Sequence, residues 1–456
     1  MGAGAVVIVG AGPCGIGCAR ELVALGHQGF TLLESRSTPG GLASSVVDPA
    51  GFTWDMGGHV VFSHYGEFDQ LLEDVMDGEV ERHERSSFVR IADRWVPYPL
   101  QNNLHRLPGD IASEALVDLI EAQRSPVPAT APDGAPLDFA TWMESMFGEG
   151  ICCHFMRPYN EKVWAHSAVE MSSSWIAERV SVVDWRSAIT SLVHRRDDLA
   201  WGPNNLFAFP SRGGTGEIYR RAAEPLADYI RYETSVTSVD LATRTLTTSG
   251  GDSLGFDQLL WTGPLDRLID VMVAAPDLVR AAADQLVHNS VTMVGVGYAT
   301  PMQDTGSWFY FPDPKVPFYR ATNFAKYAAA NVPGGRTDLY SSWMTEVASS
   351  SWRPLQADGL GDRVDASLRA CGLVAAEAER VSVHVEHLPY GYPVPSIGRD
   401  AALSVIQPWL MDHGVFARGR FGSWKYELGN MDHAVKMGAD VARRLVRNVP
   451  EEAWSL

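Results

Sequence analysis

The sequence predicts an α/β fold, and three stretches of the chain support that prediction. Residues 5–9 form a short continuous apolar run, which is typical of a parallel strand buried on both faces. A glycine-rich turn, a helical apolar pattern and a second apolar strand follow at once. Farther along, residues 137–193 carry apolar side chains at helical spacing, and residues 290–385 contain alternating segments that predict a largely antiparallel sheet.

The N-terminal unit has the features of a dinucleotide-binding turn. Gly10, Gly12 and Gly15 separate the first strand from the helix, and Glu34 ends the second strand at residues 30–33. Gly10 suits a tight turn, Gly12 lets the backbone approach a pyrophosphate, and Gly15 lets helix and strand pack closely. The acidic residue is placed to accept hydrogen bonds from ribose hydroxyls. This unit is therefore predicted to be Rossmann-like.

Two further patterns favour FAD over NAD as the dinucleotide. A second glycine patch, Gly40-Gly41, follows Glu34 closely, and the residues 261–264 (WTGP) end another predicted strand. Both patterns are typical of the large FAD-dependent oxidase and mutase fold. Residues 230–248 alternate, and within them residues 235–248 read as a hairpin of two short strands. Residues 256–261 read as a buried strand and residues 432–446 as an amphipathic helix.

These elements predict a discontinuous FAD-binding domain with a helical insertion and an antiparallel β-sheet substrate domain. The FAD-binding domain is expected to take residues 1–90, 212–265 and 395–456, the helical domain residues 105–200, and the sheet domain residues 91–104, 201–211 and 266–394.

The composition limits the partners of the chain. The protein has 456 residues, 46% of them hydrophobic, and a formal net charge of −18. Broad nucleic-acid and anionic-membrane surfaces need clustered Lys and Arg, so we expect neither partner. An anionic ligand must instead be met by a few local arginines. We find no signal peptide, membrane span or metal-ligand spacing, and the five cysteines suggest no disulfide framework, so we expect a cytoplasmic protein.

Six segments then make the sequence specific. They are GGLASSVVDPAGFTWDMGGHVVFSHY (40–65), WVPYPLQNN (95–103), FMRPYNEKVWA (155–165), FPSRGGTG (209–216), PFYRATNF (317–324) and GRFGSWKYELGNMDH (419–433). In this order and over nearly the whole length, they resemble the UDP-galactopyranose mutase family, in its eukaryotic-type form.

The resemblance implies an isomerase that interconverts the pyranose and furanose forms of a nucleoside-diphosphate hexose. It implies reduced FAD as cofactor, with flavin N5 as nucleophile at the anomeric carbon and NADPH as reductant. A nucleotide sugar would be the main partner, and a homo-oligomer is left open.

The resemblance also implies roles for individual residues. Those implied in catalysis are His59, Arg179, Arg320 and Tyr426. Those implied in cofactor binding are Gly10, Gly12, Gly15, Glu34, Gly41, Gly58, Arg420 and Asn430. Those implied in substrate binding are Arg90, Tyr98, Gln101, Asn160, Trp164, Asn204, Tyr310 and Tyr392. Guanidinium groups suit a diphosphate because each can bond two phosphate oxygens at once.

The sequence departs from the family pattern beside the base and beside the flavin. Leu100 stands where the family has a Phe that stacks on uracil, so guanine is an alternative base and a GDP-linked sugar, such as GDP-galactose or GDP-fucose, an alternative substrate. Met431 replaces a polar residue beside the flavin. A flavin-independent mutase assisted by a divalent cation is therefore a second hypothesis. An FAD-dependent amine-oxidase-type oxidoreductase, or a nucleotide-sugar-binding protein without activity, is a weaker one.

Overall fold

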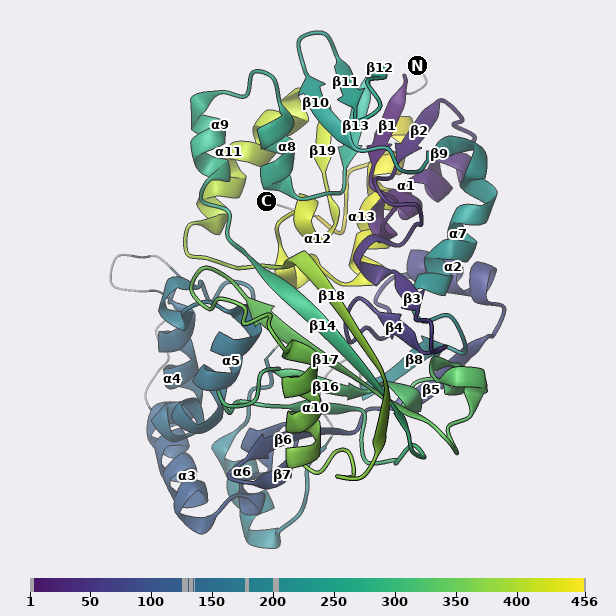
Figure 1. Cartoon of the computed structure of the whole chain (residues 1–456). Helices are drawn as coiled ribbons and strands as arrows, with labels where there is room; N and C mark the ends of the chain where they lie inside the picture. Colours follow the sequence, from purple (N-terminus) through teal and green to yellow (C-terminus); the bar gives the residue numbers. More distant parts are fainter. Residues whose placement is uncertain are drawn as a thin grey trace.

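The computed structural model describes residues 4–124, 130, 134, 136–176, 180–199 and 205–454. A parallel sheet with helices on both faces forms one end of the molecule, and a large, mostly antiparallel sheet crosses the other end (Figure 1). Helices of the middle of the chain pack beside this second sheet (Figure 1).

The parallel sheet is the Rossmann-like unit. Its strand order is β19-β13-β1-β2-β9, and each neighbouring pair is parallel. The strands are β1 (Val6–Val9), β2 (Phe30–Leu33), β9 (Ile230–Arg231), β13 (Gln258–Trp261) and β19 (Val415–Ala417). The apolar run at the N-terminus is thus a central strand, as predicted.

Alternate residues of β1 supply two different cores. Val6 and Ile8 pack with helices α1 (Pro13–Ala24), α2 (Gly66–Met76), α7 (Gly216–Ala223) and α13 (Met431–Arg447). Val7 faces the other side, where α8 (Leu265–Val271), α9 (Asp277–Ala283) and α11 (Arg399–Asp412) pack. Because the side chains of a strand alternate between its faces, burial on both faces explains why β1 is continuously apolar.

The second sheet has the strand order β18-β14-β17-β16-β15-β6-β7. Every neighbouring pair is antiparallel except β15 and β6, which run parallel. The strands are β6 (Ser87–Ile91), β7 (Arg94–Pro97), β14 (His288–Ala299), β15 (Trp308–Tyr310), β16 (Arg320–Asn323), β17 (Ser341–Ser349) and β18 (Glu379–Pro393). The predicted antiparallel sheet is confirmed.

The middle of the chain is helical, as predicted. Its helices are α3 (Gly109–Arg124), α4 (Phe139–Ile151), α5 (Arg157–Trp164) and α6 (Trp185–His194), and a π-helical turn (Cys152–Met156) joins α4 to α5. They share one apolar cluster with β6 and β7. Helix α10 (Leu360–Ala370) packs against β14 of the second sheet.

Three small sheets complete the fold. The predicted hairpin is β10 (Val236–Asp240) and β11 (Thr245–Thr248), extended by β12 (Ser253–Gly255). Strand β3 (Ser45–Val47) pairs with β4 (Thr53–Asp55), and β5 (Val80–Glu84) with β8 (Leu206–Pro210).

The division into three domains stays a prediction. Strand β6, in the second sheet, crosses the boundary expected at residue 90. Within the described part of the chain, no helix is both long enough and apolar enough to span a membrane.

Candidate functional site

Three adjoining cavities lie where the two sheets and helix α13 meet. Cavity 1, of about 620 Å³, lies along the glycine turn after β1. Cavity 2, of about 240 Å³, lies beside α5, and cavity 3, of about 220 Å³, is lined by residues of both neighbours. Asn430, directly before α13, lines all three cavities. The cavities therefore adjoin one another around Asn430.

The glycine turn at cavity 1 requires its glycines for two different reasons. Gly10 has a φ of +99°, and a Cβ there would lie 2.3 Å from Oγ1 of Thr262, whose hydroxyl donates to the carbonyl of Val9 at 2.8 Å. A Cβ on Gly15 would lie 1.9 Å from the carbonyl oxygen of Gly10. Gly15 therefore acts in packing the helix against the turn and does not line the cavity.

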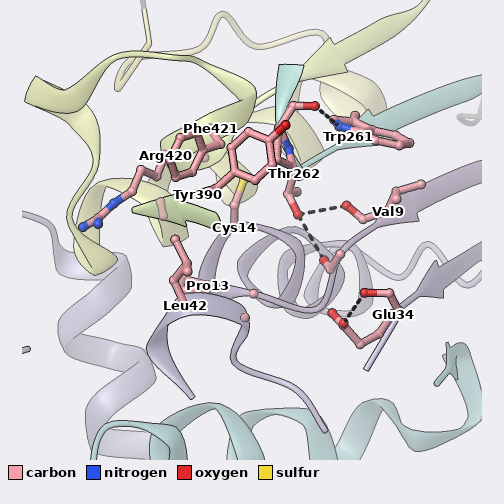
Figure 2. Close-up of a pocket in the computed structure, with 18 of the residues that line it drawn as sticks. Val9, Pro13, Cys14, Glu34, Leu42, Trp261, Thr262, Tyr390, Arg420 and Phe421 are labelled. Atoms are coloured by element: carbon pink, nitrogen blue, oxygen red, sulfur yellow. Dashed lines mark hydrogen bonds between the residues drawn. The ribbon is translucent and has the colours of Figure 1, made fainter. Parts of the chain in front are cut away.

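Glu34 and Arg420 mark opposite ends of the cavity (Figure 2). The carboxylate of Glu34 accepts from the backbone N–H of Ala11 at 2.7 Å and from that of Arg36 at 2.8 Å. It thus fixes the glycine turn, and its oxygens keep further lone pairs for ribose hydroxyls.

The other end of cavity 1 opens into cavity 3. His59, Arg420 and Met431 line both. Burial lowers the pKa of His59 to about 4, and the charges of Arg420 and Arg320 act in the same direction. The imidazole is therefore neutral at physiological pH. Helix α13 begins here. Its first backbone N–H groups have no partner within the helix, so they favour a negatively charged ligand at this end of the cavity.

Cavity 2 is lined mainly by aromatic side chains. Tyr98, Tyr159, Trp164, Trp175, Tyr310, Tyr392 and Tyr426 contribute. The ring centroids of Trp164 and Tyr426 lie 4.8 Å apart, and those of Tyr98 and Tyr310 lie 5.1 Å apart. Burial raises the pKa of the Tyr310 and Tyr392 hydroxyls, so both stay protonated and can donate hydrogen bonds.

An ion pair between the half-buried Arg320 and the buried Glu346 lies between cavities 2 and 3. Arg320 donates from Nε and Nη2 to Oε1 of Glu346, at 2.9 and 2.6 Å. Arg320 lines both cavities, and Glu346 lines cavity 3. Burial opposes the ionisation of Glu346, but Arg320 and the hydrogen bonds of Tyr319 and Gly58 hold its pKa below the ordinary value.

The structure brings together most of the residues implied by the resemblance. Those lining the cavities are Gly10, Gly12, Glu34, Gly41, Gly58, His59, Tyr98, Gln101, Asn160, Trp164, Tyr310, Arg320, Tyr392, Arg420, Tyr426 and Asn430. Arg179 and Asn204 lie outside the described residues. Gln101 is almost fully buried and donates to the backbone carbonyl of Ser181 at 2.5 Å.

The structure places Arg90 away from these three cavities, and its role in substrate binding stays a prediction. Its guanidinium lies over the ring of Trp95, 5.2 Å from the centroid, and does not line any of the three cavities. The reason is strand alternation on β6: Val89 and Ile91 face the core beside cavity 2, so Arg90 faces the opposite side.

The structure supplies three polar site residues that the sequence analysis missed. Arg85, just before β6, lines cavity 2, as does Tyr319, and Glu346 lines cavity 3. An acid inside the otherwise uncharged run of β17 was a signal that could have identified Glu346, because an ionised side chain in a buried strand needs a partner. Nothing in the sequence distinguishes Arg85 from its neighbouring arginines.

The structure also bears on Leu100 and on metal binding. Leu100 lies in the core cluster and is not among the described residues that line cavity 2. His64, Asp432 and His433 form a group that could hold a metal ion, although no metal-ligand spacing was seen in the sequence. However, Asp432 already pairs with Nδ1 of both rings, at 2.8 and 3.2 Å.

Comparisons with known proteins agree with this geometry. Residues 13–446 match the family described as flavin containing amine oxidoreductase. A crystal structure of reduced UDP-galactopyranose mutase is similar, with 38% sequence identity and a TM-score of 0.92, covering 97% of this chain and 93% of that chain. This chain belongs to the UDP-galactopyranose mutase family.

More distant structures share only the fold. A protein described as a putative protoporphyrinogen oxidase from Exiguobacterium sp. 255-15 is 16% identical with a TM-score of 0.72, covering 98% of this chain and 99% of that chain. Cyclohexylamine oxidase from Brevibacterium oxydans IH-35A is 18% identical with a TM-score of 0.67, covering 97% and 98%. The fold is therefore the α/β, Rossmann-like fold of FAD-dependent amine oxidases and the mutase family.

Cavity 1 fits FAD. It has a glycine turn whose backbone is open to the cavity at Gly12, where a Cβ would meet only atoms 3.9 Å away. It has an acid at one end for the ribose, and a helix N-terminus with Arg420 at the other end for the electron-rich part of a reduced flavin. The donor set thus suits a dinucleotide with a ribose, a pyrophosphate and a reduced flavin.

Proposed function

We propose that this protein is a mutase that interconverts the pyranose and furanose forms of a nucleoside-diphosphate hexose, with reduced FAD as its cofactor. The observation that supports this most directly is that the three cavities adjoin, with Arg320 lining both cavity 2 and cavity 3. A substrate with a diphosphate near Arg320 would extend its sugar through cavity 3 to the cofactor cavity.

The diphosphate would be held by arginines. Arg320 and Arg85 both line cavity 2, so their charges can offset two phosphates that have left water. We propose Arg179 as a third cation for this site, on the resemblance alone. Tyr310, Tyr392 and Tyr426 would donate hydrogen bonds from their hydroxyls, and Tyr98, Gln101, Asn160 and Trp164 would contact the nucleotide end.

When bound and reduced, FAD would supply the nucleophile for the anomeric carbon. The residues of this chain would orient the sugar and displace water from it, since His59, Gly58, Tyr392 and Tyr426 line cavity 3. A neutral His59 adds no positive charge beside the flavin and can accept or donate one hydrogen bond. The protein thus fixes geometry and charge around a covalent step.

The proposal also names the base and the sugar of the substrate and the reductant of the flavin. We propose a UDP-linked galactose as the first substrate to test and a GDP-linked galactose or fucose as the alternative. NADPH is proposed as the reductant. The cation-assisted mechanism and amine oxidation remain competing hypotheses for the experiment below.

The experiment incubates purified, FAD-loaded protein with UDP-galactofuranose or a GDP-linked furanose, with and without dithionite, and separates the isomers by chromatography. Conversion to the pyranose form after reduction is the expected result, and NADPH should replace dithionite. Conversion that is equal without reduction and stops with EDTA would favour the cation-assisted mechanism instead.

Two controls sharpen the result. The Arg90→Ala protein should retain conversion, because Arg90 lies outside the cavities, whereas Arg320→Ala should lose it. Hydrogen peroxide formation from putrescine or cyclohexylamine, without any conversion of nucleotide sugars, would show an amine oxidase and contradict the proposal.

A further inference from the structure

Glu346 connects two parts of the site that are far apart in the sequence. It lies in β17, is only 2% exposed, and is the cross-strand neighbour of Arg320 in β16. Its Oε1 accepts from both Nε and Nη2 of Arg320, and its Oε2 accepts from the hydroxyl of Tyr319. Since Nε and Nη2 both donate to Glu346, this carboxylate fixes which edge of the guanidinium is left to face the cavities.

The same carboxylate oxygen also holds the backbone beside the cofactor cavity. Oε1 of Glu346 accepts from the N–H of Gly58 at 2.8 Å. A Cβ on Gly58 would lie 2.9 Å from that oxygen and 3.1 Å from Nη2 of Arg320. Only glycine therefore lets this backbone rest against the ion pair.

The residue after Gly58 reaches the cofactor side. His59 lines cavity 1 and cavity 3, and the turn that carries it is closed by a bond from the N–H of His59 to the carbonyl of Gly57 at 2.7 Å. A continuous set of bonds thus runs from Arg320 through Glu346 and Gly58 to His59. The hydrogen bonds in it are 2.6–2.9 Å long, and the one from Gly58 to Glu346 is buried.

We propose that Glu346 is a positioning residue that couples the nucleotide site to the cofactor site, so that binding of each ligand strengthens binding of the other. This proposal rests on the proposed function. A cofactor packed against His59 orders the turn at Gly58, which fixes Glu346 and, through it, Arg320. The nucleotide then binds an arginine that is already ordered, so less conformational entropy is lost on binding. Thermodynamic linkage makes the effect reciprocal.

The test measures the affinity of the protein for FAD by equilibrium dialysis, with and without saturating UDP or GDP. In the wild-type protein the nucleotide that binds should tighten FAD about tenfold, within the usual range of coupling between two sites. In Glu346→Gln, which keeps the size but not the charge, the factor should fall below about twofold. Unchanged coupling in this variant would overturn the proposal.

A matched variant separates coupling from general loosening of the sheet. Thr345 is the buried neighbour of Glu346 in β17, and its hydroxyl donates to the carbonyl of Val294, away from the cavities. Thr345→Val should keep the wild-type coupling factor. If it loses coupling as Glu346→Gln does, the effect belongs to the strand and the proposal is wrong.

The wild-type protein alone also decides the question if the variants fail to fold. Tightening of FAD by nucleotide supports the coupling, whereas UDP or GDP binding that leaves FAD affinity unchanged overturns the coupling and leaves the proposed function intact. Binding of neither nucleotide overturns both.

Discussion

The Arg85 guanidinium lies over the ring of Tyr98, 5.7 Å from its centroid, and both residues line the cavity beside α5. Tyr98 belongs to a segment that resembles the base-binding stretch of the mutase family, so the pair places a cation beside the proposed nucleotide. Arg90, five residues farther on, lies on the opposite side of the sheet, against Trp95.

This pair gives the first prediction. Arg85→Ala should weaken UDP or GDP binding by about tenfold, the cost of losing one charge contact of about 1.4 kcal/mol. Arg90→Ala should leave the dissociation constant unchanged. Isothermal titration of the two variants checks both statements, and equal loss in the two would contradict the assignment of Arg85.

The second prediction concerns Arg320 itself. Arg320→Ala should raise the nucleotide dissociation constant by about 30-fold or more, since it removes a diphosphate partner and leaves the Glu346 carboxylate unpaired in the site. Arg336→Ala, which removes an exposed arginine paired with Asp338, is the control and should bind as the wild-type protein does. Fluorescence titration with a labelled nucleotide measures both, and unchanged affinity of Arg320→Ala would rule out the site.

The third prediction is the charge state of His59. Because burial lowers its pKa to about 4, below the ordinary value of 6.5, the unfolded chain binds this proton more tightly than the folded protein does. The contribution of the neutral His59 to the free energy of unfolding is therefore full above pH 6.5, and it is lost as the pH falls through about 4. In ¹³C-edited NMR spectra the His59 ring signal, identified by its loss in His59→Gln, should not shift between pH 8 and 5.5. A midpoint near 6.5 would contradict this.

The fourth prediction concerns a buried lysine outside the reaction. Lys162, in α5, is 3% exposed and donates to the carbonyls of Phe311, Asp313 and Phe318 at 2.7, 2.9 and 2.7 Å. It therefore ties α5 to the loop between β15 and β16, which carry Tyr310 and Arg320. Burial holds its pKa well below the ordinary value.

Replacing Lys162 should lower the free energy of unfolding more than it changes the affinity for the nucleotide. Lys162→Met removes the donor that three backbone carbonyls share, so the free energy of unfolding should fall by about 2 kcal/mol. The exposed Lys315→Met is the control, with a change below about 0.5 kcal/mol. Urea unfolding followed by tryptophan fluorescence measures both, and equal stability of the two variants would show that Lys162 does not hold the loop.

Much of the fold follows from local sequence. The strand at Val6–Val9, the glycine turn and Glu34 could be predicted because each requirement lies within a few neighbouring residues: burial on both faces, a positive φ at Gly10, and an acid at the end of the next strand. The antiparallel sheet was also visible as alternation. The segment motifs gave the family, which the comparisons confirm.

The exact membership of the site did not follow in the same way. Arg90 and Arg85 are chemically alike in the sequence, and only the face that β6 presents to its neighbours separates them. Leu100 shows the same limit, since its place in the core depends on the helices that share its apolar cluster and not on its own segment.

The sequence by itself thus determined the Rossmann-like unit, the family and the need for a few local arginines in a chain of net charge −18, because these depend on short-range patterns and composition. The tertiary structure decided which of the described arginines line the site. It also decided that Glu346 bonds both Arg320 and Gly58, although Gly58 lies 288 positions from Glu346 in the chain. A contact of that kind exists only once β16 and β17 have paired and the turn after β4 has packed on them, which no local pattern can specify.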